Sequence, residues 1–160
     1  MLFRSAEAKA RWFGRSSGVP VHILRIPGIY APNREGGTPR TRLAKGVPVL
    51  TAADDVCTNH IHADDLARAC LAALFRGKPQ RITHVSDDTD LKMGDYFDLA
   101  ADMYGLPRPP RLARAEAIAQ LPAMQLSFMS ESRRLSNQRL KAELRVKLRY
   151  PTVNEGLKES

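Results

Sequence analysis

Hydrophobic and polar positions in the first half of the chain change from helical to strand-like spacing. Small apolar residues with Trp12 and Phe13 form a stripe over residues 4–17, which predicts a helix. Residues 19–26 are a short β-rich run of the kind buried in a parallel sheet. Residues 27–34, rich in Pro and Gly, predict a loop after this strand.

Shorter elements follow the loop. Thr38 is a good N-cap with Pro39 at the first helical position, so a short helix is expected to run from here to Gly46. Residues 47–50 and 56–61 are weak strand candidates on either side of a polar turn. None of these segments is long enough to form a layer of its own.

The clearest helix of the sequence opens with Asp64 and Asp65. Two carboxylates in a first turn oppose the positive end of the helix dipole, and apolar residues at helical spacing continue to a stop at Gly77. Residues 81–86 alternate as a strand, and residues 93–104 predict another helix.

The remainder of the chain predicts mainly helices. Residues 113–126 have helical spacing, and we expect one helix there despite Pro122. Ser136 is expected to cap a helix that runs through Leu144, and residues 152–155 form a capping box for a terminal helix. Helix and strand alternate first and helices follow, which indicates an α/β fold.

Composition narrows the protein class. A chain of 160 residues with 43% apolar residues suits one domain with a core. No apolar stretch approaches the ~20 residues of a membrane span, and Glu7 and Lys9 stand where a signal peptide needs apolar residues. Cys57 and Cys70 are too few for a disulfide framework, so a cytoplasmic protein is expected.

Positive charge is concentrated late in the chain. Lys and Arg number 25 against 17 Asp and Glu, a net charge of +8, and residues 108–149 hold ten basic and three acidic residues. A solvated basic face is the simplest interpretation, because no aromatic residue lies between Met129 and Tyr150 to stack on a base. A non-catalytic interaction module or nucleic-acid-binding module that uses residues 108–149 stays open as the alternative.

Three segments resemble a known family when they are taken together. They read LRIPGIYAP over residues 24–32, TNHIHADDLA over 58–67 and SRRLSNQRL over 132–140. The pattern resembles extended and atypical short-chain dehydrogenases/reductases, more narrowly the NAD-dependent epimerase/dehydratase family. The resemblance extends over nearly the whole chain and matches the C-terminal half of that fold.

The resemblance implies one partial domain over residues 1–160. Residues 1–92 would hold the late strands and helices of a doubly wound, Rossmann-like sheet, and residues 93–160 a small, mainly helical substrate lobe. No glycine-rich dinucleotide-binding turn occurs in the sequence, so this N-terminal half is expected to be missing. We therefore expect a fragment of a longer chain or the product of a misplaced start site.

The same resemblance assigns candidate site residues. Ile26, Pro27 and Gly28 would hold the nicotinamide carboxamide of NAD or NADP through backbone groups. Gly28, Tyr30 and Arg133 would contact the substrate, although the family often has Asn at the position of Gly28. Asp64 and Asp65 match the family's acidic pair at the start of a helix and are expected to be structural.

The resemblance implies no catalytic residue in this chain. Aligning Glu7 with a Glu common in the family's catalytic helix puts Met1 at the Tyr position and Ser5 at the Lys position. Neither side chain can donate the proton or supply the neighbouring cation that the chemistry requires. We expect the isolated chain neither to bind NAD(P) measurably nor to turn over a substrate.

The implied function is NAD(P)-dependent epimerase, dehydratase or reductase chemistry on a nucleotide sugar or similar small polar substrate. This chain would supply the nicotinamide-facing loop and the substrate lobe. The helices at 4–17 and 64–76 would lack part of their sheet, so exposed apolar surface, marginal stability and self-association are expected. No membrane association is expected.

Two motifs have simpler explanations. His60, His62 and Asp65 resemble part of a metallo-β-lactamase metal motif, but the remaining ligands have no candidates, so strand histidines before a helix cap are expected and no metal. Trp12, Phe13 and Tyr104 are expected to lie in the core rather than to form a stacking platform.

Overall fold

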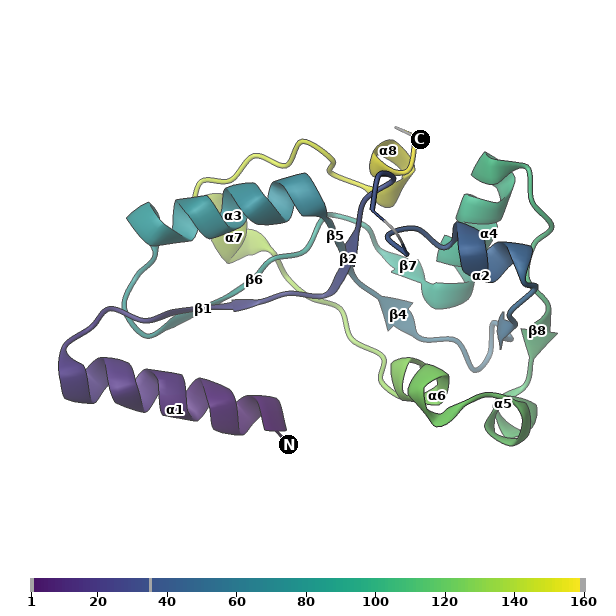
Figure 1. The fold of residues 1–160 in the computed structure, drawn as a ribbon, viewed down its shortest axis with the longest axis horizontal. Coiled ribbons are helices and arrows are strands. Elements are labelled where there is room, and N and C mark those ends of the chain that lie inside the picture. Colours follow the sequence, from purple (N-terminus) through teal and green to yellow (C-terminus); the bar gives the residue numbers. More distant parts are fainter. Residues whose placement is uncertain (1, 35, 159–160) are drawn as a thin grey trace.

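A computed structural model describes residues 2–34 and 36–158 of the chain. Helices and short strands alternate throughout (Figure 1). The helices are α1 (Leu2–Ser17), α2 (Arg40–Ala44), α3 (Ala63–Arg76), α4 (Met93–Tyr104), α5 (Arg114–Gln120), α6 (Ala123–Met129), α7 (Gln138–Ala142) and α8 (Val153–Gly156). The strands are β1 (His22–Arg25), β2 (Gly28–Tyr30), β3 (Val49–Leu50), β4 (Cys57–Thr58), β5 (His60–His62), β6 (Arg81–His84), β7 (Leu91–Lys92) and β8 (Arg111–Leu112).

Parallel pairing dominates the strands. β1 pairs with β6, β2 with β5 and β3 with β8, all parallel, whereas β4 and β7 are antiparallel. β1 and β2 follow one another along the chain but pair with different strands. The parallel pairs and the intervening helices confirm the α/β prediction.

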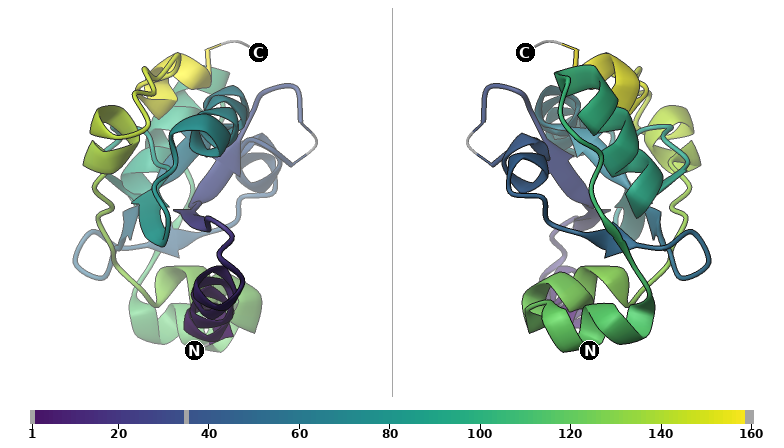
Figure 2. Two further views of the ribbon diagram at one scale, coloured as in Figure 1. Left: turned by 90° about the vertical axis from the view of Figure 1, so that its left-hand side faces the viewer. Right: turned by 90° about the vertical axis from the view of Figure 1, so that its right-hand side faces the viewer.

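The first pair of strands lies between two helices. Figure 1 shows α3 on one side of β1 and β6 and α1 on the other, and the turned views in Figure 2 agree. Glu7 on α1 accepts two hydrogen bonds of 2.8 Å from the Arg25 guanidinium at the end of β1. This ion pair connects α1 to the edge of the strand pair.

Three groups of buried side chains form the core. The largest joins β2, α2, α4 and α8, the second joins β5, α3 and α7, and the third lies under α5 and α6. Their buried members are Tyr30, Leu43, Val49, Tyr96, Phe97, Ala100, Ala101, Val153 and Leu157; Ile61, Ala69, Val85, Leu140, Leu144 and Val146; and Leu50, Ala117 and Met129. The late helices therefore pack on strands from the first half of the chain.

Several predicted elements occur where the sequence placed them. α4 covers residues 93–104 as predicted, and Gly105 ends it in the left-handed conformation at φ +62°. The predicted capping box begins α8, where the Thr152 backbone N–H donates to Glu155 Oε2 at 2.8 Å.

Other predictions were wrong. One helix over 113–126 is instead two helices, α5 and α6, separated at Leu121 and Pro122, because proline lacks the N–H that a helix interior needs. Part of the predicted loop 27–34 is strand β2, which pairs with β5. α7 begins after Asn137 rather than Ser136.

Exposed apolar side chains lie on both helices that flank β1. Trp12 and Phe13 on α1 are 65% and 52% exposed, and Leu74 and Phe75 on α3 are both 81% exposed. This confirms the expectation of exposed apolar surface on these helices. It contradicts a core position for Trp12 and Phe13, because no described strand or helix covers that face of α1. Tyr104 does pack against the largest core group.

Candidate functional site

The predicted nicotinamide loop lies at the carboxyl end of strand β1. Ile26 is 44% exposed, Pro27 is partly buried, and Gly28 is exposed as β2 begins. Ligands of open α/β sheets bind outside the carboxyl ends of the strands. The backbone of 26–28 is therefore at a position where a ligand can reach it.

Steric crowding does not require a glycine at position 28. Its N–H donates to the carbonyl of Asn59 at 3.2 Å. A Cβ at Gly28 would lie 3.4 Å from that carbonyl oxygen and 3.5 Å from Cδ2 of His60, which are ordinary contacts. A side chain would fit, so the glycine leaves space on the exposed side of the loop.

Asn59 joins this loop to the segment that carries Arg133. Its side-chain amide donates to the Arg133 carbonyl at 2.8 Å, and its Oδ1 accepts from the Leu135 N–H at 2.9 Å. The carbonyl of the same residue accepts from Gly28. Asn59 thus forms hydrogen bonds with both the predicted cofactor loop and the predicted substrate loop.

Sequence reasoning missed the role of Asn59. The residue stands within the motif that carried the family resemblance, directly before the buried strand β5. Its partners lie 74 and 76 positions further along the chain, and no local pattern indicates them.

Arg133 and the neighbouring Arg134 project from this segment. Arg133 forms an ion pair with Glu131, and both side chains are more than half exposed. Arg134 forms an ion pair with Asp90 in the loop before β7. The contact of Arg133 with a substrate stays a prediction.

A cysteine lies beside the same two arginines. The backbone N–H of Cys57 donates to Ser132 Oγ at 3.0 Å. Hydrogen bonds from Arg134 and then from Ser132 lower the pKa of the Cys57 thiol. The thiol is only partly buried, so the thiolate is accessible to solvent reagents.

Tyr30 lies deeper than the rest of the predicted site. It is 2% exposed, and its hydroxyl donates a long hydrogen bond of 3.4 Å to the Thr152 carbonyl. A Cβ on Gly156 of α8 would lie 2.7 Å from Tyr30 Cε2. Burial raises the pKa of Tyr30, so the phenol stays neutral and packs β2 against α8. Its substrate contact stays a prediction.

Two buried histidines occupy β5. His62 accepts the Asp64 N–H at Nδ1, over 3.2 Å, and stacks on Tyr150 at 3.8 Å between ring centroids. His60 stacks on Tyr96 at 4.2 Å, and burial lowers the pKa of His60 to about 4. His62 therefore ends β5 and also caps α3, a role that the sequence analysis did not assign to it. Among residues 2–34 and 36–158, no group of three or more His, Cys, Asp or Glu side chains is arranged to hold a metal.

Asp65 has the structural role expected of it. The side chain is fully buried, and it accepts the backbone N–H groups of Arg149 at 2.9 Å and Tyr150 at 2.8 Å. Arg68 adds an ion pair at 2.8 Å. Asp65 thereby fixes the start of α3 to the segment before α8.

A second buried carboxyl group follows β6. Asp87 is 5% exposed, its Oδ1 accepts the Thr89 N–H at 3.0 Å, and its own N–H donates to the His60 carbonyl at 2.8 Å. Burial raises the pKa of Asp87 to about 7. The sequence indicated only an acidic turn here, because burial depends on distant segments.

Of the two positions matched to the family's Tyr and Lys, one lies among the described residues. Met1 lies outside the described residues, and Ser5 is an exposed residue of α1. In the described chain no helix is both long and apolar enough to cross a membrane.

Comparison with known proteins identifies the fold. No family model matches the sequence, and no curated protein matches it. A conserved protein of unknown function from Silicibacter pomeroyi matches in structure with a TM-score of 0.74 and 33% identity over 88% of this chain. A nucleoside-diphosphate-sugar epimerase from Pseudomonas aeruginosa matches 96% of this chain at 23% identity and TM-score 0.76. A UDP-glucose 4-epimerase from Thermotoga maritima, solved with UDP-glucose, matches 97% at 19% identity and TM-score 0.74.

This chain spans about half the length of those structures: 47%, 50% and 49% of the three respectively. Other matching structures are complexes with NADPH or NAD. With the parallel strand pairs and the helices on both sides of β1, these matches show that the chain has part of the Rossmann-like α/β fold of sugar-nucleotide epimerases and dehydratases.

Proposed function

We propose that this chain supplies the nicotinamide-facing loop and the substrate lobe of an NAD(P)-dependent epimerase, dehydratase or reductase. The substrate is a nucleotide sugar or a similar small polar molecule. Residues 93–160 contribute most of the lobe, and the protein acts in the cytoplasm. The observation that carries the proposal is the Asn59 contact, which holds the Gly28 loop beside the Arg133 segment.

The residues present fit only one end of a dinucleotide. Backbone groups of 26–28 are accessible at a strand end, which suits the nicotinamide carboxamide. A bound nicotinamide would supply hydride transfer. The affinity of such a cofactor comes mostly from backbone N–H groups at its pyrophosphate, and the sequence has no glycine-rich turn to provide them. The isolated chain is therefore inactive in this proposal.

In this proposal Gly28 and Arg133 contact the substrate directly, and Tyr30, which is 2% exposed, contributes to the site through the position of β2. The exposed Arg133 guanidinium can donate two parallel hydrogen bonds to a diphosphate oxygen pair, and the space at Gly28 accepts a sugar hydroxyl. The buried Tyr30 ring packs against α8 and so holds β2 in place. Asn59 is the positioning residue that keeps the two loops together.

Nuclear magnetic resonance with UDP-glucose tests the proposal on the isolated chain. Expected shifts are confined to residues 26–30 and 131–135, and Arg133→Gln removes them. Arg108→Gln, which changes an exposed arginine paired with Asp102, is the matched control and leaves them unchanged. Shifts that survive Arg133→Gln would contradict the site.

Calorimetry with NAD and NADP tests the cofactor half of the proposal. Binding tighter than about 10 µM by the isolated chain, on a scale where each tenfold is ~1.4 kcal/mol, would show that the cofactor site is misplaced. Asn59→Ala should weaken UDP-glucose binding, because the 131–135 segment loses its two hydrogen bonds to the Asn59 side chain and keeps the contacts of Ser132 with Cys57 and of Arg134 with Asp90.

Self-association follows from the exposed helix faces. Trp12 and Phe13 on α1 and Leu74 and Phe75 on α3 leave apolar surface uncovered on both sides of β1. Sedimentation velocity should show association that increases with concentration. A single monomer species up to high concentration would contradict this part of the proposal.

The nucleic-acid alternative has less support from the contacts. Several cations of residues 108–149 are engaged with acidic side chains, among them Arg111 with Asp98 and Lys141 with Asp88. Binding driven by the remaining charge would be weak and salt-dependent. Retention of submicromolar RNA binding at physiological salt would favour the alternative.

A further inference from the structure

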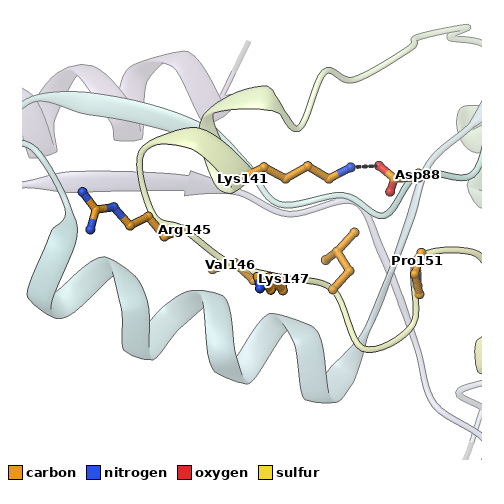
Figure 3. A pocket seen from close by; sticks show the side chains of 7 residues that line it. Asp88, Lys141, Arg145, Val146, Lys147 and Pro151 are labelled. Carbon is orange, nitrogen blue, oxygen red and sulfur yellow. Dashed lines mark hydrogen bonds and ion pairs between the residues drawn. The ribbon is translucent and has the colours of Figure 1, made fainter.

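A hollow lies between the end of α7 and the segment 145–151 that follows this helix. Figure 3 shows Lys141 of α7 reaching to Asp88 on one side of the hollow, with the segment 145–151 on the other side. The volume of the hollow is about 360 Å³, which is within the range of small-molecule sites. None of its lining residues belongs to α3 or to the loops 26–30 and 131–135, so the hollow is separate from the candidate site.

Backbone hydrogen bonds fix both ends of the segment 145–151. At its start the Val146 N–H donates to the Leu140 carbonyl of α7 at 3.2 Å. Near its end Asp65 accepts two backbone N–H groups of the segment, at 2.9 Å and 2.8 Å. This wall of the hollow is therefore preorganised, which reduces the conformational entropy that a ligand must offset on binding.

The floor of the hollow is apolar. Val146, Leu148 and Pro151 all line it. Val146 is buried in the second core group, and Leu148 packs against the same group. A ligand with an apolar body buries surface on this floor and gains free energy, whereas a bare inorganic ion cannot use it.

The charge around the floor is positive. Lys141 is paired with Asp88, and the carboxylate of Asp88 also accepts a hydrogen bond of 2.8 Å from the Asn137 amide. Arg145 and Lys147 also line the hollow and are exposed, and neither has an acidic partner within the described part of the chain. The lining therefore carries two positive charges that no carboxylate compensates.

We propose that this hollow binds a phosphate monoester of a small soluble molecule. Such a phosphate carries a charge of about −1.5 to −2 at pH 7, which matches the two uncompensated cations. A sulfate ester, a carboxylate or a nucleic-acid phosphodiester carries a single charge and would leave part of the positive charge unmatched. Lys147 and Arg145 hold the phosphate oxygens, and the organic part lies on the apolar floor. The inference is independent of the proposed enzymatic function, because the two sites share no residue.

Nuclear magnetic resonance titration of the isotope-labelled full chain with phenyl phosphate tests the proposal. The ring of this probe can cover the floor, and its phosphate has the required charge. Expected shifts are confined to residue 88 and residues 141–151, with a dissociation constant below about 1 mM. Shifts confined to residues 26–30 or 131–135 would place the phosphate at the candidate site and overturn the proposal.

Two related anions separate the contributions of charge and apolar surface. Phenyl sulfate keeps the ring but carries one charge, and inorganic phosphate keeps the charge but lacks the ring. Each should bind about tenfold more weakly than phenyl phosphate. Equal affinity for phenyl sulfate would overturn the selection of a phosphate, and equal affinity for inorganic phosphate would overturn the selection of an ester.

Charge variants locate the site. Lys147→Gln should weaken phenyl phosphate binding by about fivefold. Lys45→Gln removes the same charge at the exposed C-terminal end of α2 and should leave the affinity unchanged. Equal effects of the two variants would mean non-specific attraction and overturn the site.

A backbone-compatible variant excludes a folding artefact. Arg145 has a φ of +54°, in the left-handed region that favours glycine, so Arg145→Gly removes the cation without straining the chain. The variant should melt close to the wild-type temperature and bind phenyl phosphate about fivefold more weakly. Wild-type affinity in this folded variant would overturn the role of Arg145.

Vesicles distinguish a soluble ester from a lipid headgroup of the same chemistry. Phosphatidate in phosphatidylcholine vesicles presents a phosphate monoester on a flat surface, which fits a concave hollow poorly. Cosedimentation of the full chain with these vesicles is expected to be no greater than with phosphatidylcholine alone. Strong cosedimentation that Lys147→Gln removes, without any response to phenyl phosphate, would overturn the soluble ligand.

Discussion

Replacement of Asp87 by Asn isolates the pH dependence of one buried carboxyl group. The side chain is 5% exposed, and among described atoms no hydrogen-bond partner reaches its Oδ2. Burial has the largest effect on its pKa; hydrogen bonds from Thr89 lower the pKa, and the negative charges of Asp88 and Asp65 raise it. Burial therefore dominates and raises the pKa of Asp87 to about 7.

The sign of the effect follows from proton linkage. The ordinary pKa of the group is 3.8, so between pH 3.8 and about 7 the folded state holds a proton that the unfolded state has lost. The free energy of unfolding falls as pH rises through this window, by about 1.4 kcal/mol per pH unit. From pH 5 to pH 7 Asp87 lowers stability by about 2 kcal/mol, because the slope halves as the pH reaches the folded-state pKa.

His60 has the opposite effect. Burial lowers the pKa of His60 from 6.5 to about 4, so the unfolded state binds the extra proton in this range and stability is lost as pH falls. Between pH 4 and 6.5 the two slopes oppose each other. The wild-type profile should therefore be shallower there than that of Asp87→Asn, which uncovers the slope of His60 and of His84, whose pKa burial also lowers.

Urea denaturation followed by circular dichroism at 222 nm measures the free energy of unfolding at each pH for the wild type and for Asp87→Asn. The stability of Asp87→Asn relative to the wild type should increase by about 2 kcal/mol from pH 5 to pH 7. Asp95→Asn, an exposed carboxylate in the first turn of α4, is the matched control and should run parallel to the wild type. Parallel profiles for Asp87→Asn as well would refute the reasoning.

Three further predictions concern the packing and chemistry of the site. Gly156→Ala should lower the free energy of unfolding by about 2 kcal/mol, because a Cβ there meets the Tyr30 ring; a melting temperature equal to wild type would contradict this contact. Gly28→Ala should change stability by less than about 0.5 kcal/mol, and a larger loss in urea denaturation would mean hidden crowding. Arg134→Gln should raise the pKa of Cys57 and slow its alkylation by iodoacetamide at pH 7, measured by peptide mass spectrometry, with the other cysteine as internal control.

Features set by neighbouring residues were predictable from the sequence. The α4 helix has apolar spacing and a terminal Gly105, and both signals act within one helical turn. The capping box before α8 needs only residues 152–155. Pro122 also carried a local signal, and the prediction of one helix through it gave too much weight to the apolar pattern.

Features that depend on distant segments were not predictable. The apolar stripe of the first helix indicated an inner face, but it did not show that Trp12 and Phe13 would remain uncovered. The burial of Asp87 depends on distant segments such as β5, whose His60 carbonyl accepts its N–H, and the sequence does not position them. The Asn59 side chain donates a hydrogen bond to a segment 74 residues further along the chain. The sequence does not indicate this partner, because an Asn before a short strand can form several other kinds of contact.

The distribution of neutral and exposed groups supports a positioning role for this chain. Burial keeps Tyr30 as a phenol and His60 as an uncharged imidazole, and both rings are held in the core beneath β2 and β5. A general acid or base must reach the reacting atom within hydrogen-bond distance, and these buried rings do not. Gly28 and Arg133, in contrast, are exposed at the strand end and can orient a ligand. In the proposed function these exposed groups bind and orient the substrate, while the buried rings hold β2 and β5 in place beneath them.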